Sequence, residues 1–379
     1  MAQIKKILIV CGEPSGDLLA GNLAGQINVL NPDIKIFAVG GDTLSQSKAE
    51  IFYNIKGLAV MGLFDVLKNI PKFLRLKRII LNKIKTENPD AVILVDFSGF
   101  NLRLAKEINN VTPVIYYVSP QIWASRPGRI NQIKKFIRRM IVLFKFEEKL
   151  YRSAGVDTYF AGHPLVDIVK PKQNKQDFLK NNGLDPQKTT IALLPGSRKQ
   201  EIKHILPVML EASGLIAEKI PRIQFVIARS GNVESATYQK IVNGSRLDLK
   251  IIKNKTHDCL NAADLSLVCS GTATLEAGLV GKPFLIVYKM SLLNYLLYRP
   301  QVKIPYIGII NIIAEKKIIP EFIQFRATGS KICREAVTLL NDKELQKKMQ
   351  NDLTDACANL GSSGASMRAA QSILDFFNK

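Results

Sequence analysis

Short apolar segments alternate with longer amphipathic segments along the whole chain. Clusters of aliphatic and β-branched residues predict strands, and apolar residues at helical spacing predict helices between them. This alternation is typical of βαβ units around a parallel sheet. Strands are expected near residues 5–11, 34–39, 91–95, 113–118 and 140–143 in the first half, and near 190–194, 223–227, 249–252, 264–268 and 283–287 in the second.

A polar stretch at residues 170–188 separates the two series and has no strand pattern, so it is predicted to be a linker. The predicted fold class is α/β, with two doubly wound Rossmann-like domains facing a cleft. The domains are expected at residues 1–170 and 171–379. The pattern leaves open whether the last helix crosses back to the first domain.

The chain is strongly basic, with 53 Lys and Arg against 32 Asp and Glu and a net charge of +21. Such a field favours nucleic acid, anionic lipid or phosphorylated substrates. A biased genome composition is an equally good explanation of the lysines. Nucleic-acid binding is disfavoured because the aromatic residues, 7% of the chain, do not cluster with the lysines.

Cysteine spacing and apolar run length exclude several classes of protein. The five cysteines include no CxxC pair, which argues against a disulfide framework or a zinc site. The apolar runs are far shorter than the roughly 20 residues that cross a bilayer. The N-terminus lacks the apolar core of a signal peptide. We therefore expect a cytoplasmic protein.

Two motifs follow strands of the first domain. The strand at 7–11 runs into a turn, GEPSGD at 12–17, whose spacing is not that of a dinucleotide site. The turn could contact a ligand, since ligands of such sheets bind beyond the carboxyl ends of the strands. It could instead be only a tight turn in which Asp17 caps the helix. Asp96 follows the apolar strand 91–95, where its carboxylate could act as a general base or cap the next helix. Position alone does not decide between these two roles.

Two loops of the second domain could be simple structural turns, but together they favour a nucleoside diphosphate site. Arg198 follows one strand and can bind phosphate through two hydrogen bonds. After another strand, Gly271 and Thr272 begin a helix whose first amides can hold a pyrophosphate, and Glu276 can accept hydrogen bonds from ribose hydroxyls. The chain has no DxD pair to bind a divalent metal and no P-loop. We therefore expect no metal and no cofactor.

The motifs resemble those of the lipid-A-disaccharide synthase family over nearly the whole chain. They are GEPSGD (12–17), VMG with LFDVL (60–67), DFSGFN (96–101), YVSPQIWASRPGR (117–129), GHPLVD (162–167), LPGSR (194–198), SGTATLEAGLVGKP (270–283), and PYIGIINIIA with PEFIQ (305–314, 320–324). The resemblance implies a metal-independent, inverting glycosyltransferase of the B-type fold. It would transfer 2,3-diacylglucosamine from its UDP derivative to 2,3-diacylglucosamine 1-phosphate, forming a β-1,6 disaccharide of lipid A.

The resemblance also implies roles for individual residues. Asp96 would be the base, and the UDP-sugar would contact Arg198, Ser197, Gly271, Thr272, Glu276 and Asn311. The acceptor side would include Glu13, Ser15, Asp17, Trp123 and His163. Trp123 could instead be a packed loop anchor, and His163 is the second candidate for the base. The chain departs from the family at Ser125, where Trp is usual, at Ile310, where Pro is usual, and at 315–317, where Gly-Arg-Glu is usual.

A basic, apolar segment at residues 66–85 contains seven basic residues, no acidic residue and Pro71. It predicts two amphipathic helices, either packed on the core or lying in an anionic membrane interface. Acylated substrates favour peripheral association with the inner leaflet of the inner membrane. The expected membrane contacts are Phe73, Leu74, Lys77, Arg78 and Leu81.

Two further questions stay open at this point. Another B-type UDP-N-acetylglucosamine transferase, or a UDP-N-acetylglucosamine 2-epimerase, would share the roles of Arg198 and Glu276 but would need no basic apolar surface. The sequence also leaves a homodimer open.

Overall fold

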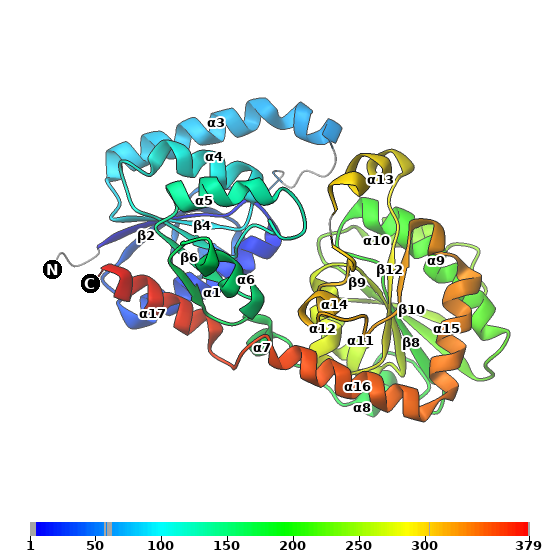
Figure 1. Ribbon diagram of the computed structural model, residues 1–379. Coiled ribbons are helices and arrows are strands. Elements are labelled where there is room, and N and C mark those ends of the chain that lie inside the picture. The colour runs from blue at the N-terminus through cyan, green and yellow to red at the C-terminus, as the bar shows by residue number, and fades with distance from the viewer. Residues whose placement is uncertain (1–4, 57, 59–62, 303, 378–379) are drawn as a thin grey trace. The chain divides into compact units, whose positions relative to one another are not determined.

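The computed structural model describes residues 5–56, 58, 63–302 and 304–377 (Figure 1). The VMG motif at 60–62 lies outside these residues. Contacts divide the chain into two compact units. Unit 1 comprises residues 1–167, 301–303 and 360–379, and unit 2 comprises residues 168–300 and 304–359.

Unit 1 is built around a parallel sheet in the order β3-β2-β1-β4-β5-β6-β7. Its strands are β1 (Lys6–Val10), β2 (Lys35–Gly40), β3 (Glu50–Asn54), β4 (Ala91–Val95), β5 (Val114–Tyr117), β6 (Arg139–Val142) and β7 (Thr158–Phe160). Its helical segments are α1 (Pro14–Leu30), α2 (Asp42–Gln46), α3 (Leu63–Glu87), α4 (Ser98–Ile108), η1 (Pro127–Arg129), α5 (Ile130–Phe136), α6 (Lys145–Ser153) and α17 (Ala365–Phe377).

Unit 2 repeats this plan with a parallel sheet in the order β10-β9-β8-β11-β12-β13. Its strands are β8 (Thr189–Leu194), β9 (Ile223–Arg229), β10 (Leu249–Lys253), β11 (Leu265–Cys269), β12 (Phe284–Tyr288) and β13 (Glu321–Ile323). Its helices are α8 (Lys175–Asn181), α9 (Lys199–Ala217), α10 (Ser235–Val242), α11 (Thr256–Ala262), α12 (Thr272–Val280), α13 (Leu292–Tyr298), α14 (Ile309–Ile313), α15 (Gly329–Asn341) and α16 (Lys343–Ala358). The short segments α7 (Leu165–Ile168), η2 (Arg299–Gln301) and η3 (Gln324–Arg326) complete the described elements.

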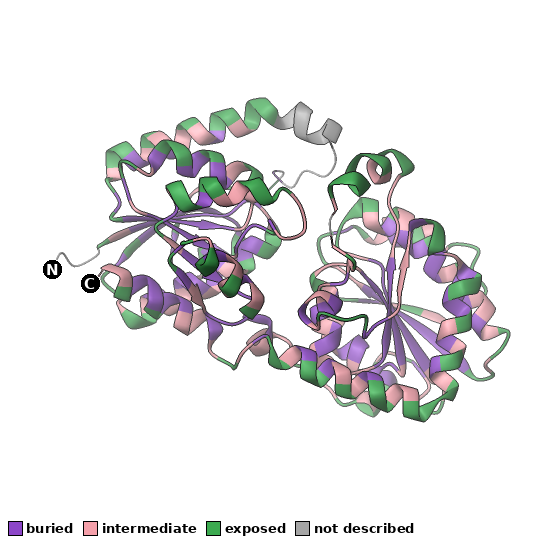
Figure 2. Cartoon of the chain, in the orientation of Figure 1, coloured by how far each residue is buried: buried purple, intermediate pink, exposed green. Residues whose placement is uncertain are grey.

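Each sheet reverses its strand order at one point, between β1 and β4 in unit 1 and between β8 and β11 in unit 2. The central strands are buried on both faces, as Figure 2 shows, because helices cover both sides of each sheet. Ligands of doubly wound sheets bind beyond the carboxyl ends of the strands at such a switch point. The predicted two-domain α/β fold is therefore confirmed, and it places a candidate site on each unit.

The structure corrects two predictions of local structure. The segment at 66–85 lies within one helix, α3, which contains Pro71. The polar stretch predicted as a linker contains α8, whose first turn is capped by Asn174 through a 2.9 Å hydrogen bond from the Asp177 amide to Oδ1. The short edge strands β3, β7 and β13 were not expected, because few of their residues are buried and their sequences carry little alternation.

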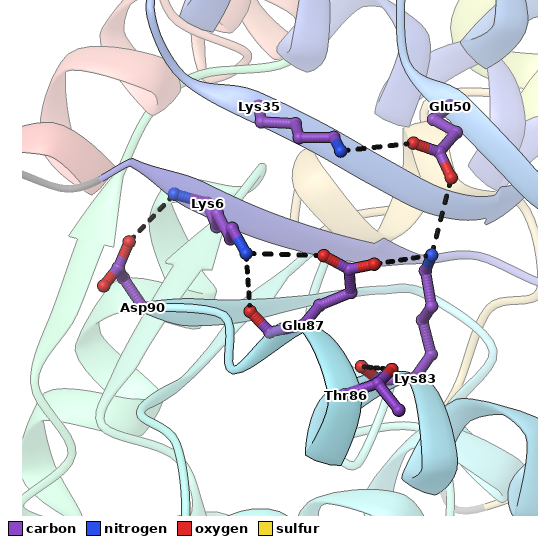
Figure 3. A network of polar contacts seen from close by, with 7 residues as sticks. All are labelled: Lys6, Lys35, Glu50, Lys83, Thr86, Glu87 and Asp90. Carbon is purple, nitrogen blue, oxygen red and sulfur yellow. Dashed lines mark hydrogen bonds and ion pairs between the residues drawn. The ribbon is translucent and has the colours of Figure 1, made fainter.

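A network of charged side chains fixes the C-terminal end of α3 to the sheet of unit 1 (Figure 3). Lys83 Nζ lies 3.0 Å from Glu87 and 3.4 Å from Glu50, and Lys6 Nζ lies 3.4 Å from Glu87. The hydrogen bond to Glu87 raises the pKa of Lys83, and the same bond lowers the pKa of Glu87. This network lies at the amino-terminal ends of β1 and β2, so it belongs to the structure and not to the candidate site.

The C-terminal helix α17 packs against α1 of unit 1 (Figure 1). Arg139 Nη1 donates a 2.8 Å hydrogen bond to the carbonyl of Ser372, and its guanidinium lies 4.9 Å from the centre of the Phe376 ring. Asp167 accepts hydrogen bonds from the Gly364 amide at 3.0 and 3.1 Å. The helix α17 and the loop before it are therefore an integral part of unit 1.

Candidate active site

Asp96 lies where β4 ends, next to the first turn of α1. A Cβ atom built on Gly16 would lie 3.8 Å from Asp96 Cβ and 3.5 Å from Cys11 Cβ. Gly12 lies under the ring of Phe97, because a Cβ at that position would approach the ring to 2.3 Å. The glycines of the GEPSGD turn therefore allow this turn to pack closely against the DFSGFN loop.

The backbone at Asp96 has an unusual conformation. Asp96 and Phe97 both have a φ of +49°, in the left-handed region that residues with a Cβ rarely adopt. The Asp96 carbonyl accepts hydrogen bonds from the Tyr116 hydroxyl and, at 2.9 Å, from Asn101 Nδ2. The Asp96 amide donates to the carbonyl of Tyr117 at 3.1 Å. These bonds fix the position from which the half-buried carboxylate projects.

Asp17, one of the predicted acceptor contacts, is buried and accepts hydrogen bonds from three backbone amides of α2 and its approach. The donors are Gly41 at 2.6 Å, Thr43 at 2.9 Å and Leu44 at 3.3 Å. The carboxylate thus caps α2, a helix other than the one that the sequence suggested. Glu13 precedes α1 and is half-buried, and Ser15 is exposed on its first turn.

Trp123 is joined to a buried carboxyl group that sequence analysis did not single out. Its Nε1 donates a 3.0 Å hydrogen bond to Glu147 Oε1, and its ring packs edge-on against Phe146 at 5.3 Å. Burial raises the pKa of Glu147 to about 7. These contacts are those of a loop anchor, the alternative role considered for Trp123. The only sequence feature that pointed to Glu147 was its place among the acidic residues in the first turn of α6.

His163 is buried, with its ring 5.3 Å from that of Phe144. Its Nδ1 accepts a 3.1 Å hydrogen bond from the Leu165 amide, so in the neutral ring the proton is on Nε2. Burial lowers the pKa of His163 to about 4. A ring whose lone pair is already occupied is a poor general base, so this geometry favours Asp96 over His163.

The segment after Trp123 reaches the loop that carries Asp96. Arg129, at the end of η1, is half-buried, and its Nη1 donates a 3.3 Å hydrogen bond to the hydroxyl of Ser98. Ser98 begins α4, two residues after Asp96. Arg129 is therefore a further candidate for contact with an anionic substrate. Arg129 ends the YVSPQIWASRPGR motif, but the sequence did not distinguish it from the other residues there.

Arg198 and Ser197 lie in the loop between β8 and α9. Glu201 Oε2 accepts hydrogen bonds from the amides of Ser197 at 3.1 Å and Arg198 at 3.2 Å, and Glu201 Oε1 lies 3.3 Å from Arg198 Nη1. Gly196 has a φ of +114°, and a Cβ there would approach Glu201 Oε2 to 2.5 Å. Glu201 thus shapes the loop, while the Arg198 side chain stays 45% exposed.

The neighbouring loop joins β11 to α12, and β11 pairs with β8. Gly271 precedes the helix with a φ of +135°, and Thr274 Oγ1 donates a 2.8 Å hydrogen bond to its carbonyl. The amides at the start of a helix lack intrahelical acceptors and attract anions. Thr272 is the first residue of α12, so this end of the helix and Arg198 follow adjacent strands.

Glu276 is in the second turn of α12, and its side chain is 22% exposed. Its Oε2 lies 3.2 Å from Nε2 of His257, at the start of α11. This contact holds one carboxylate oxygen of Glu276. His257 was not singled out from the sequence, because it lies on a different element from the nucleotide motifs.

Asn311, a predicted contact on the UDP side, is buried in α14, and its amide group is fully hydrogen-bonded. Nδ2 donates to the Ile319 carbonyl at 2.8 Å and to Glu321 Oε1 at 2.9 Å. Oδ1 accepts from the amides of Ile318 and Ile319. The side chain therefore fixes this loop and has no remaining hydrogen bond to offer a ligand.

The structure gives the surroundings of the three positions at which the chain departs from the family. Ser125 is half-buried in the loop before η1. Ile310 is buried, and a Cβ built on Gly278 of α12 would lie 2.8 Å from its Cδ1. Glu315 has a φ of +54°, a conformation that explains why glycine is usual there.

The residues expected to contact a membrane have different environments on α3. Leu74 is 49% exposed and Arg78 is exposed, whereas Phe73, Lys77 and Leu81 are half-buried. The Phe73 ring lies 5.9 Å from that of Phe97 and 6.2 Å from that of Phe100. Lys77 Nζ pairs with Glu107 at 2.7 Å. Leu76, Ile80 and Ile84 form the buried face of the helix.

Within the described ranges, no group of three or more His, Cys, Asp or Glu side chains is arranged to hold a metal ion. No helix in those ranges combines the length and hydropathy needed to span a membrane.

The two Rossmann-like units, with polar loops at each switch point, define a protein of the glycosyltransferase B-type fold. The chain has the fold of the calicheamicin glycosyltransferase CalG4 (TM-score 0.61, 15% identity, 100% of this chain and 99% of that one). It also has the fold of the Neisseria meningitidis UDP-GlcNAc 2-epimerase, solved bound to UDP-GlcNAc (TM-score 0.64, 14% identity, 98% and 100% of the chains). At this identity the likeness shows the fold alone.

The particular family follows from sequence comparison. The family model described as lipid-A-disaccharide synthetase matches residues 7–376, and the chain belongs to this family. It is 38% identical to the lipid-A-disaccharide synthase of Syntrophus aciditrophicus over 378 residues, which cover 99% of this chain and 98% of that protein. It is 36% identical to the corresponding protein of Coxiella burnetii strain CbuG_Q212, over 97% and 98% of the two chains.

Proposed function

We propose that this protein is an inverting glycosyltransferase that makes the lipid A disaccharide. It transfers 2,3-diacylglucosamine from its UDP derivative to the 6-hydroxyl of 2,3-diacylglucosamine 1-phosphate, and UDP leaves. The observation that supports this most is that the family motifs lie at the switch points, with Asp96 after β4 in unit 1 and Arg198 after β8 in unit 2.

Unit 2 supplies the groups that hold the nucleotide. The diphosphate is bound by the first amides of α12, near Gly271 and Thr272, and by the guanidinium of Arg198. Glu276 accepts hydrogen bonds from the ribose hydroxyls while His257 fixes its other oxygen. As the bond from the anomeric carbon to the diphosphate breaks, charge builds up on the leaving oxygen. The same positive groups stabilise that charge.

Unit 1 supplies the base. The acceptor 6-hydroxyl attacks the anomeric carbon from the face opposite UDP, and its proton passes to the carboxylate of Asp96. The bond to the acceptor oxygen forms on one face of the anomeric carbon while the bond to UDP breaks on the opposite face, so the anomeric configuration inverts. The hydrogen bonds from Tyr116 and Asn101 to the Asp96 carbonyl keep the carboxylate in position during this transfer.

Arg129 is suited to bind the phosphate of the acceptor. It is joined to Ser98 on the loop of Asp96, and arginine binds phosphate through two parallel hydrogen bonds. Glu13 and Ser15 lie on the α1 turn beside Asp96 and can contact sugar hydroxyls. Asp17 and Asn311 act indirectly in this scheme, because their polar atoms already hold backbone groups, Asp17 those at the start of α2 and Asn311 those of the segment after α14.

Both substrates carry acyl chains, so we propose that the protein acts at the inner leaflet of the inner membrane. The N-terminal part of the described surface of α3 supports this, because Ile70 and Leu74 are 42% and 49% exposed beside exposed Lys72, Arg75 and Arg78. Basic residues around exposed apolar side chains favour an anionic interface.

The proposal is tested by incubating the protein with both acylated sugars and identifying the products by mass. We expect the tetraacylated disaccharide phosphate and one UDP per disaccharide. Unacylated UDP-N-acetylglucosamine serves as the comparison substrate. Equal use of unacylated sugar would favour a general UDP-N-acetylglucosamine transferase, and conversion of the donor without any acceptor would favour a 2-epimerase.

A further inference from the structure

The short helix α13 of unit 2 exposes an apolar face. Leu292, Leu293 and Leu296 are 54%, 55% and 61% exposed, and Leu297 is 40% exposed. At 100° per residue these four leucines cover one continuous side of the helix. No residue of α13 is buried. Figure 2 shows α13 as one of the most exposed helices of unit 2.

Contacts with the segment of Gln324 and Phe325 fix the position of α13. Gln324, which is buried, accepts a 3.1 Å hydrogen bond from the Met290 amide and donates one of 3.1 Å to the Met290 carbonyl. The ring of Tyr295, on the other side of α13, packs edge-on against Phe325 at 5.7 Å. Phe325 is itself 68% exposed and adds an exposed aromatic ring beside α13. Contiguous apolar surface of this kind marks a binding face.

The segment that carries α13 is positively charged. Residues 284–302 contain no Asp or Glu, and Lys289 and Arg299 stand on either side of α13 in the sequence. Arg326, next to Phe325, is also exposed. Apolar side chains surrounded by basic residues are complementary to a bilayer that contains anionic lipid.

We propose that α13 and Phe325 form a lipid-docking surface of unit 2, which inserts its leucines into the interface of an anionic bilayer. A second copy of this chain is a poorer occupant, because a symmetric contact would bring the basic residues of both copies together. A single acyl chain is also a poorer occupant, because ligand chains are usually enclosed in a concave site. The inference does not depend on which sugar the protein transfers.

This surface would have a consequence for the donor site. α13 follows β12, which pairs with β11, and the carboxyl end of β11 carries the loop of Gly271. Docking of α13 would therefore keep the nucleotide-binding loops of unit 2 near the surface in which an acylated donor is dissolved.

The test uses the full chain and vesicles of phosphatidylcholine with or without phosphatidylglycerol. The double variant Leu293→Ser/Leu296→Ser should bind anionic vesicles at least about tenfold more weakly than the wild type. The control Val29→Ser/Val111→Ser removes two valines of unit 1 that are 69% and 65% exposed, and it should bind like the wild type. Both variants should melt like the wild type, because the changed side chains are exposed.

A second measurement detects insertion directly. The wild type has one tryptophan, Trp123, which gives the baseline of quenching by brominated lipids. In Leu296→Trp, the added fluorescence should be quenched on anionic vesicles and not in solution. Unchanged vesicle binding by the double variant, together with an unquenched tryptophan, would overturn the proposal. Two other outcomes would also overturn it: loss of a dimer with unchanged vesicle binding, or a raised KM for acylated donor alone.

Discussion

At the scale of single residues, the most informative feature is the backbone at Asp96. A left-handed conformation costs a residue with a Cβ about 1–2 kcal/mol, and here Asp96 and Phe97 both adopt it. The cost is tolerated because Tyr116 and Asn101 bind the Asp96 carbonyl. Strained residues that surrounding bonds hold in place often mark functional positions. This strain could not be predicted from the apolar strand and the single acidic residue that follows it.

The first prediction concerns the leaving group. Arg198→Ala should lower kcat/KM for the UDP donor by about 30- to 1,000-fold, because a lost charge partner of the diphosphate is worth roughly 2–4 kcal/mol. Steady-state kinetics with varied donor would measure this. Lys199→Ala is the matched control, since it removes the same charge from the adjacent exposed position. Equal kinetics for the two variants would argue against the role of Arg198.

The second prediction follows from the raised pKa of Glu147. Between pH 4.5 and about 7 the unfolded chain has lost this proton while the folded protein still binds it, so the free energy of unfolding falls as pH rises. The full loss, on the order of 3 kcal/mol, is reached above pH 7. Glu147→Gln keeps an acceptor for Trp123 but does not ionise. Its stability relative to the wild type should therefore increase from pH 5 to pH 8.

Urea unfolding at these two pH values, followed by the fluorescence of Trp123, measures the difference. His163 has a lowered pKa of about 4, so its proton uptake on unfolding decreases stability as pH falls below its ordinary value. That effect is common to both proteins and cancels in the comparison. A difference that does not change with pH would mean that Glu147 is already ionised well below pH 7.

A third prediction uses a departure from the family. Glu315 has a φ of +54°, where glycine has no steric cost. Glu315→Gly should stabilise the protein by roughly 0.5–1 kcal/mol, the steric gain less the added freedom of the unfolded chain. Thermal unfolding would show a slightly higher midpoint. Glu344→Gly, a substitution in the first turn of α16, serves as the control and should be destabilising. A lower midpoint for Glu315→Gly would contradict this explanation.

At the scale of elements, α3 shows what periodicity could and could not predict. The spacing predicted an amphipathic helix but left open whether its apolar face packs on the core, and in the structure Leu76, Ile80 and Ile84 are buried. Its continuity through Pro71 was not, because proline in a helix interior usually breaks or kinks it. The distinction between Leu74, which is exposed, and Phe73, which packs on Phe97, depends on a loop 24 residues away in the chain.

The fourth prediction is that exposed residues of α3 bind membrane. Ile70→Ser/Leu74→Ser should weaken sedimentation with anionic vesicles by about tenfold, since two partly exposed aliphatic side chains lose their contact with lipid. High salt should weaken binding of the wild type, because it screens Arg75 and Arg78. The double variant at Val29 and Val111 is again the control. Binding that resists both changes would assign α3 to core packing alone.

The strands at both switch points could be predicted because each is a short apolar run followed by small or polar residues. The same logic located Arg198, Gly271 and Asp96. It could not distinguish ligand contacts from structural contacts, because Asp17 and Asn311 belong to the family motifs yet bind backbone groups of the protein, at the start of α2 and after α14. Glu147, His257 and Arg129 were missed since their partners are distant in sequence.

At the scale of the whole molecule, the two units share one plan and carry different chemistry. The switch point of unit 1 presents a carboxylate, and that of unit 2 presents a guanidinium and the start of a helix. An inverting transfer needs both, a base for the acceptor and positive groups for the leaving diphosphate. The net charge of +21 suits anionic substrates and an anionic surface. We therefore expect substitution of the carboxylate in unit 1 to lower the rate of transfer and to leave nucleotide binding in unit 2 unchanged.

The most direct test is the turnover of Asp96→Asn with saturating donor and acceptor. Asparagine tolerates the left-handed backbone, so the variant should fold and melt like the wild type. It lacks the basic carboxylate, and we expect kcat to fall by about 10²–10⁴-fold while the dissociation constant for UDP stays unchanged. Near-normal turnover of the folded variant would contradict the assignment of Asp96 as the base.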